Sequence, residues 1–280
     1  MEKKKEIKDQ FVIAYLTDLE NTKAIVDNSI AFAKLLDKGL ILLHISDPKY
    51  TNISTQEAEL KLQSINSSIS EVPFHSYCAI EGSTREILNN IPHFLSGVLL
   101  ITSVDANAKN KANSPKILLD NLYTSRIAYF VDSIENKNPL NFDNIILTLE
   151  NFRESKEKVL WASYFGRFAK SEITIYYHKY KDEYFQKQLK FNIAFAAKMF
   201  NNFSLNYNYF DSENTKTFVD HQAIQFAKEE NASLVICQTT KNKDWTNTLF
   251  GLNEYKTIPN KENIPILFVN PREDLFILCE

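Results

Sequence analysis

The stretch FVIAYLTDLENTKAIVDNSIAFAKLLDKGLILLHIS, residues 11–46, contains a strand, a helix and a second strand in succession. It opens with the apolar run FVIAYLT, which has the length of a buried strand. Apolar residues then recur every three or four positions from Ile25 to Leu36, which predicts an amphipathic helix. Gly39 ends this helix as a C-terminal glycine, and LILLHIS at 40–46 is the next strand. The stretch therefore predicts a β-α-β unit.

The same alternation continues through the first half of the chain. The next predicted elements are a polar helix at 54–69, a strand at 73–80, a short helix at 83–91, a strand at 97–103, a helix at 114–123 and a strand at 126–132. Strands that are apolar throughout are typical of a parallel sheet that is covered on both faces. The first half is therefore predicted to be an α/β domain with five strands.

The second half repeats this pattern. Its predicted strands lie at 144–150, 172–179, 204–210, 233–239 and 264–270, with helices ending at 166–170 and spanning 183–200, 215–230 and 249–258. The alignment of the halves places His178 opposite His44 and Gln238 opposite Thr102. A repeat of domain length indicates a duplication. The polar linker SIENKNPLNFD at 133–143 sets the boundary, which gives domains 1–138 and 139–280.

The fold class is therefore two tandem α/β domains, each a five-stranded, mostly parallel sheet with helices on both faces. Right-handed crossovers leave the flavodoxin-like and the adenine nucleotide alpha hydrolase-like strand orders as leading candidates, and the pattern does not choose between them.

Composition narrows the class of protein. The net charge of −3 lacks the basic excess of a nucleic-acid binder, and no apolar run has the length that spans a bilayer. Three cysteines, Cys78, Cys237 and Cys279, have no metal-ligand spacing and fit a reducing compartment. We therefore expect a cytoplasmic protein that binds neither nucleic acid nor membrane.

The residues of the opening stretch resemble the start of a universal stress protein. In that family a strand ends in Thr-Asp, as at Thr17 and Asp18, and the second strand ends in Leu-His, as at His44. EGSTREIL at 81–88 and IPILFVNP at 264–271 resemble the family's third helix start and terminal strand. The likeness covers nearly all of both halves and implies a tandem universal stress protein whose domains pair as an intramolecular pseudo-dimer through their last strands. A further homodimer stays open.

The resemblance also implies a nucleotide cleft. The nucleotide-binding branch of the family carries a glycine loop after the fourth strand, because the backbone must approach phosphates closely. The first half has no glycine in this loop, and the second keeps only Gly251. We therefore expect poor ATP binding and no required cofactor, with ATP or AMP left open. The candidate cleft positions implied by the resemblance are Thr17, Asp18, Ile45, Thr102, Ser103, Glu150, Gln238, Thr239 and Gly251.

Several of these residues have plainer interpretations. The plainer interpretation of Asp18 is a cap or first-turn acid at the start of the first helix. The strand-ending histidines, His44 and His178, favour a packing position with one ring nitrogen bonded to the backbone, because no carboxylate is spaced for metal or base work. The loop lysines, at 109, 111, 241 and 243, could attract an anion, but solvated charge is the stronger expectation.

No nucleophile elbow, Walker loop or His-Glu-x-x-His helix is present in the sequence. The leading hypothesis is a non-enzymatic universal stress protein that acts in stress adaptation through contacts with proteins. The alternative is a module that binds an adenine nucleotide or another small ligand through one or both clefts.

Overall fold

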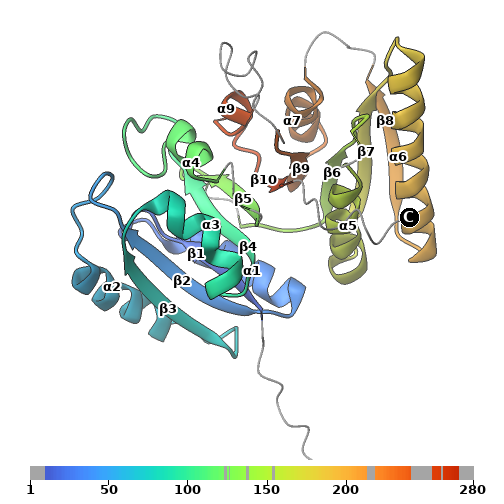
Figure 1. Cartoon of the computed structure of the whole chain (residues 1–280). Coiled ribbons are helices and arrows are strands. Elements are labelled where there is room, and N and C mark those ends of the chain that lie inside the picture. Colours follow the sequence, from blue (N-terminus) through green and yellow to red (C-terminus); the bar gives the residue numbers. More distant parts are fainter. Residues whose placement is uncertain are drawn as a thin grey trace, which may run out of the picture. The chain divides into compact units, whose positions relative to one another are not determined.

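A computed structural model describes residues 10–122, 125, 127–136, 139–152, 155–212, 218–240, 254–259 and 261–270 (Figure 1). Strands and helices alternate through both halves, as the hydrophobic periods predict. The first half contains β1 (Phe11–Tyr15), α1 (Lys23–Leu36), β2 (Gly39–Ser46), α2 (Thr55–Ser67), β3 (His75–Glu81), α3 (Thr84–Phe94), β4 (Gly97–Val104), α4 (Pro115–Leu122) and β5 (Ala128–Ser133).

The second half repeats the order and adds a π-helical turn. It contains β6 (Asn144–Thr148), α5 (Ser155–Tyr164), the π-helical turn (Phe165–Ala169), β7 (Glu172–His178), α6 (Glu183–Asn202), β8 (Tyr207–Ser212), α7 (Val219–Glu229), β9 (Leu234–Gln238), α9 (Glu254–Thr257) and β10 (Ile266–Val269). The predicted helix that ends at 166–170 is confirmed, and its last turn is the π-helical one.

Residue contacts group the chain into two compact units. One unit ends at Ile127 and the other begins at Ala128, except that Val104–Ala106 group with the second. The strand β5 therefore belongs by sequence to the first half and by packing to the second unit. The predicted boundary near residue 138 concerns the sequence repeat and stays a prediction.

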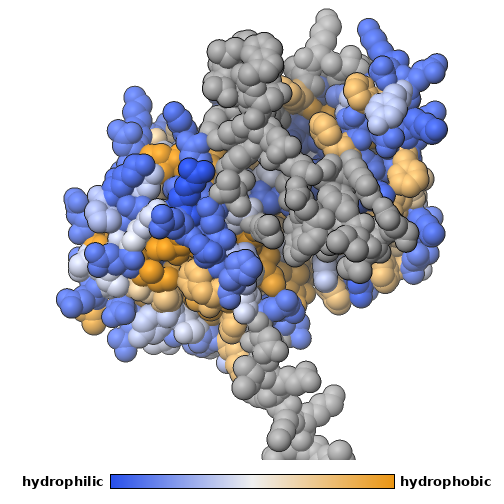
Figure 2. All heavy atoms as spheres, in the orientation of Figure 1, coloured by the Kyte–Doolittle hydropathy of each residue, from blue (hydrophilic) through white to orange (hydrophobic). Residues whose placement is uncertain are grey.

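The first unit has its strands in the order β3-β2-β1-β4, and the neighbouring pairs are parallel. This order decides against the flavodoxin-like alternative, in which the third strand would lie next to the first. The helix α1 packs on β1 and β2, α2 packs on β2 and β3, and α3 lies against α4. Hydrophilic residues predominate on the visible face around α2, in keeping with its polar sequence (Figure 2).

The second unit has the equivalent order β8-β7-β6-β9-β10, and β5 follows at the β10 edge. The pairs β8-β7, β7-β6, β6-β9 and β9-β10 are parallel, whereas β5 and β10, the last strands of the two halves, are antiparallel. The helices α5 and α6 pack side by side, while α7 packs on β6, β7 and β9. The right-handed connections that follow β6 and β9 run to opposite faces of the sheet. A crevice is therefore expected between these connections, beyond the carboxyl ends of the two strands.

Candidate functional site

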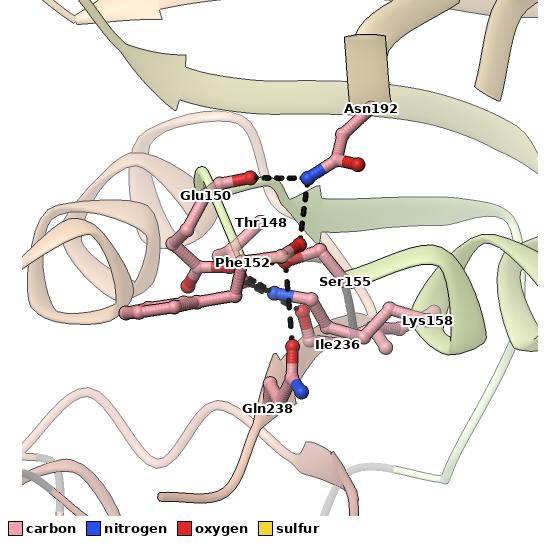
Figure 3. A network of polar contacts seen from close by, with 8 residues as sticks. All are labelled: Thr148, Glu150, Phe152, Ser155, Lys158, Asn192, Ile236 and Gln238. Carbon is pink, nitrogen blue, oxygen red and sulfur yellow. Dashed lines mark hydrogen bonds and ion pairs between the residues drawn. The ribbon is translucent and has the colours of Figure 1, made fainter. Parts of the chain in front are cut away.

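A buried ion pair lies in the second unit beyond the carboxyl end of β6, where the fold predicts a crevice. Glu150 lies two residues beyond the end of β6, and Lys158 projects from α5 with a fully buried side chain. The Lys158 Nζ lies 2.5 Å from Glu150 Oε2 and donates a hydrogen bond to Thr148 Oγ1 over 3.0 Å (Figure 3). The lysine charge is thus compensated inside the protein, at the place where the fold would present a ligand site.

Polar side chains from three elements hold this pair in place (Figure 3). The Ser155 hydroxyl lies 3.2 Å from Glu150 Oε2 and 3.3 Å from Gln238 Oε1, and its single hydrogen can serve one acceptor at a time. Asn192 Nδ2, on α6, donates to the backbone oxygens of Glu150 and Phe152 over 2.8 and 2.7 Å. The network therefore fixes the segment that follows β6 against both α5 and α6.

A second buried carboxyl group lies beside the pair, on α7. Burial and the negative charge of Glu150 raise the pKa of Asp220 to about 7, although Lys158 opposes this shift. Its Oδ1 is buried without a hydrogen-bond partner. Burial and the charge of Asp220 also raise the pKa of the Cys237 thiol well above its usual value, so this cysteine is not an activated nucleophile.

The pairing of Lys158 bears on anion binding in the second unit. A phosphate site needs free backbone amides or an uncompensated cation, and Lys158 is already paired with Glu150. In the part of the chain that the structure describes, no group of three or more His, Cys, Asp or Glu residues could hold a metal ion. In the second unit, the polar side chains beyond the end of β6 therefore bond to one another.

The first unit lacks this lysine. Both helices end in a left-handed residue, Asp37 after α1 and Lys170 after the π-helical turn. Lys158 lies 12 residues before Lys170, and the residue 12 positions before Asp37 is Ile25. If the extra residue of the π-helical turn is left out of the count, the equivalent residue is Val26. Both are buried apolar residues. The two units therefore differ in charge at this helical position.

The structure shows how the predicted residues of the first unit are used. Asp18 Oδ1 accepts from the Glu20 amide over 2.9 Å, and Oδ2 accepts from Asn21 Nδ2 over 2.8 Å. The cap of α1 is Thr22 rather than Asp18. Thr17 Oγ1 is buried and has no hydrogen-bond partner.

The remaining described candidates are buried, and two of them donate hydrogen bonds within the protein. Thr102 Oγ1 donates to the Tyr15 carbonyl over 3.2 Å, and Thr239 Oγ1 donates to Asn270 Oδ1 over 2.6 Å. Ser103 and Ile45 are buried. Lys241, Lys243 and Gly251 lie outside the described residues. Whether any of these residues contacts a ligand stays a prediction.

The loop after β4 is exposed at both of its lysines, 109 and 111. Between them Asn110 has a φ of 59°, the conformation that a glycine would favour. Asparagine tolerates this region better than most residues, so the loop adopts a glycine-like turn without glycine.

The predicted correspondence of His44 and His178 is wrong by one residue. The backbone amide of Leu16 donates to Leu43, and the amide of Leu149 donates to Tyr176, so Leu149 is equivalent to Leu16 and Tyr176 to Leu43. His178 thus matches Ile45. A shift of one residue in a strand moves a side chain to the other face of the sheet.

The two histidines accordingly have different surroundings. His44 Nδ1 lies 2.7 Å from the Leu16 carbonyl, as the packing interpretation predicts, and burial lowers its pKa. His178 Nδ1 is buried without a hydrogen-bond partner, and its ring lies 4.9 Å from that of Tyr180.

The correspondence of Thr102 and Gln238 is shifted in the same way. With β1 and β6 aligned as above, Leu147 is equivalent to Ala14. Ala14 lies opposite Ile101 in β4, and Leu147 lies opposite Ile236 in β9, so these two isoleucines are equivalent. Gln238 therefore matches Ser103.

Sequence reasoning missed five residues of the site: Thr148, Ser155, Lys158, Asn192 and Asp220. A signal for Lys158 is present in the sequence. It falls on the same helical face as Ser155, Val159 and Ala162, all of which are buried. A lysine on an otherwise uncharged buried face predicts a buried partner, here Glu150.

Comparison with known proteins supports the fold. No family model and no curated protein sequence matches the chain. It is similar to the crystal structure of a universal stress protein from Archaeoglobus fulgidus DSM 4304, with a TM-score of 0.70, 13% identity, and coverage of 95% of this chain and 98% of that chain.

Two structures from Pseudomonas aeruginosa are also similar. A functionally unknown protein from strain PAO1 has a TM-score of 0.63 and 10% identity, and covers 97% of this chain and 95% of its own. A candidate universal stress protein from strain UCBPP-PA14 has a TM-score of 0.62 and 11% identity, with 97% and 96% coverage. Over nearly its full length, the chain therefore has the α/β fold of these universal stress protein structures.

Proposed function

We propose that this chain is a tandem universal stress protein that acts in stress adaptation, in the cytoplasm, as a non-catalytic module for protein contacts. The full-length likeness to universal stress protein structures supports the family. In the described residues, no helix is long and apolar enough to cross a membrane.

The buried pair of Lys158 and Glu150 carries the proposal that nucleotide binding is weak. A nucleotide entering the second crevice would have to displace Lys158, whose Nζ lies 2.5 Å from Glu150 Oε2. Separating a buried pair costs about 3 to 5 kcal/mol, roughly half of the free energy of about 8 kcal/mol that a micromolar ligand supplies. Without phosphate glycines the ligand has little to offset this cost.

The test begins with protein purified without added nucleotide. Denaturation followed by chromatography and mass spectrometry would detect co-purified adenine compounds, and calorimetric titration with ATP and magnesium would detect binding. We expect neither a stoichiometric compound nor micromolar binding. Measurable turnover of ATP that follows the protein through purification would overturn the non-catalytic assignment.

The alternative function is binding of an adenine nucleotide or another small ligand in the first unit. The apolar Ile25 and Val26, which stand where the second unit has Lys158, favour it because they leave that crevice without a buried cation. The buried, unpartnered Thr17 Oγ1 and the carboxylate of Asp18 would hydrogen-bond the ligand.

Paired substitutions test this alternative. Asp18→Ala should weaken ATP binding about tenfold or more if its carboxylate accepts a ligand hydrogen bond. Asp27→Ala is the control, because Asp27 is an exposed residue of α1 that pairs with Lys23. If Asp18→Ala binds ATP as the native protein does, this assignment is wrong.

The predicted pairing of the two halves and a further homodimer are also part of the proposal. Light scattering would give 32.4 kDa for a single chain and twice that value for a homodimer.

A further inference from the structure

A cavity lies in the second unit at the amino ends of β7 and β8. It has a volume of about 300 Å³ and is lined by the π-helical turn, by the residue that precedes β7, and by the segment between α6 and β8. Its charged and aromatic lining residues are Arg167, Phe168, Lys170 and Phe203. The amino ends of β7 and β8 border it, whereas the crevice lies beyond the carboxyl ends of β6 and β9.

The π-helical turn positions these side chains. Single π-helical turns are frequent at functional sites because the extra residue redirects the side chains that follow. Gly166 permits a close approach here, since a Cβ would lie 2.8 Å from Leu205 Cδ1. Lys170 has a left-handed conformation, with φ 64°, which ends the turn beside the cavity.

The guanidinium of Arg167 lies over two aromatic rings. Its guanidinium carbon lies 4.9 Å from the ring centre of Phe168 and 4.3 Å from that of Phe203. Stacking uses the faces of the guanidinium and leaves its N–H donors, which lie in the plane, for a bidentate acceptor. Among the described residues Arg167 has no hydrogen bond or ion pair.

The charged side chains among the described residues that line the cavity are both cationic, Arg167 and Lys170. Lys170 also makes no ion pair with any described residue, and none of the described lining residues is acidic. The neighbouring carboxylate, Glu172, accepts from Asn208 Nδ2 over 3.2 Å and does not line the cavity. Two cations without a carboxylate therefore share one cavity with two half-exposed phenyl rings, Phe168 at 53% and Phe203 at 45%.

We propose that this cavity binds a small organic oxyanion, a carboxylate or phosphate monoester attached to a flat apolar body. The guanidinium of Arg167 takes two oxygens of the anion in its plane, and the ammonium of Lys170 adds a point charge. The apolar body lies against Phe168 and Phe203. A cavity of this size accepts a single-ring compound, and ligands of that size bind at about millimolar Kd when the site is open to water.

The experiment titrates phenyl phosphate and benzoate into the full-length protein and follows amide chemical shifts or calorimetric heat. Inorganic phosphate and acetate serve as probes without the apolar body. We expect phenyl phosphate to bind at least about tenfold more tightly than inorganic phosphate, and added salt to weaken binding severalfold.

Three variants assign the site. Arg167→Gln should weaken phenyl phosphate about tenfold or more, and Arg167→Lys should recover only part of this loss because a lysine keeps the charge but not the fork. Lys187→Gln is the matched control, an exposed lysine on α6 that does not line the cavity. The thermal midpoint of each variant checks that it is folded.

Two results would overturn the proposal. One is absence of saturable binding of phenyl phosphate and benzoate up to about 20 mM, well above the expected Kd. The other is equal weakening by Arg167→Gln and Lys187→Gln, which would indicate diffuse attraction by surface charge. Both are independent of nucleotide binding in either crevice.

Discussion

Replacing Lys158 with methionine tests whether the crevice of the second unit depends on its ion pair. The substitution keeps most of the side chain's length and removes its charge. It abolishes the 2.5 Å contact with Glu150 and the 3.0 Å bond to Thr148. Glu150 is left with the Ser155 hydroxyl and with only 12% of its side chain exposed. The variant therefore contains an unpaired, nearly buried carboxylate.

The cost of protonating the unpaired carboxylate limits the expected loss of unfolding free energy. A carboxylate that has lost its partner can take up a proton, and for a glutamate with an ordinary unfolded-state pKa this costs about 4 kcal/mol at pH 7. Removing one partner of a buried pair costs about 3 to 5 kcal/mol in other proteins. We therefore expect Lys158→Met to lose about 3 to 4 kcal/mol at pH 7.

The loss should shrink in acid. In the variant, a buried carboxylate without a cation beside it costs less free energy once it is protonated, so the destabilisation is greatest at neutral pH and shrinks as the pH falls toward the range in which carboxylic acids ordinarily take up protons. At pH 5 the cost of protonation is only about 1 kcal/mol. Urea unfolding followed by far-ultraviolet circular dichroism at pH 7 and pH 5 measures both values.

Two companion variants complete the test. Glu150→Gln combined with Lys158→Met removes both charges and should recover most of the lost stability, because neither group is then buried as an unpaired ion. Lys187→Met changes an exposed lysine and should cost less than about 0.5 kcal/mol. A loss below about 1 kcal/mol for Lys158→Met that is equal at both pH values would refute the reasoning.

Three further predictions concern other parts of the second unit. Because the folded pKa of Asp220 is raised to about 7, the folded protein holds a proton that the unfolded chain releases, so stability should fall as the pH rises from about 4 to 7. Asp220→Asn should flatten this part of a urea midpoint profile, and an unchanged slope would contradict the assignment. Gly166→Ala should cost about 1 to 3 kcal/mol, since its Cβ would lie 2.8 Å from Leu205 Cδ1, and adding Leu205→Ala should relieve the clash in thermal unfolding. Asp182→Ala removes the cap of α6, which accepts from two backbone amides, and should lower the unfolding free energy by about 1 kcal/mol in urea.

Much of the fold could be predicted because it depends on local patterns, and the apolar runs and helical periods placed the described strands and helices. The prediction that Gly39 ends the first helix is wrong: α1 ends at Leu36, Asp37 takes the left-handed conformation, and Gly39 is the first residue of β2. Part of the site was also accessible. Glu150 and Gln238 were predicted as cleft positions, and the structure places both on the Ser155 hydroxyl.

Other features depend on contacts between residues far apart in the chain. The alignment of His178 with His44 failed because one residue of register, which hydropathy does not record, decides the face of a strand. The two strand orders could not be separated because crossover handedness limits topology without specifying it. The packing of β5 with the second unit depends on its antiparallel pairing with β10, in which Val131 lies opposite the distant Ile266.

The sequence by itself determined the class of fold, the duplication and the absence of the phosphate glycines, because periodicity and residue type are local properties of the chain. Only the tertiary structure decided what occupies the crevices. Lys158 looks like an ordinary helical lysine until β6, α5 and β9 come together around it. Burial of its ammonium group is tolerable only where Glu150 and Thr148 meet it, and that meeting is a property of the folded chain.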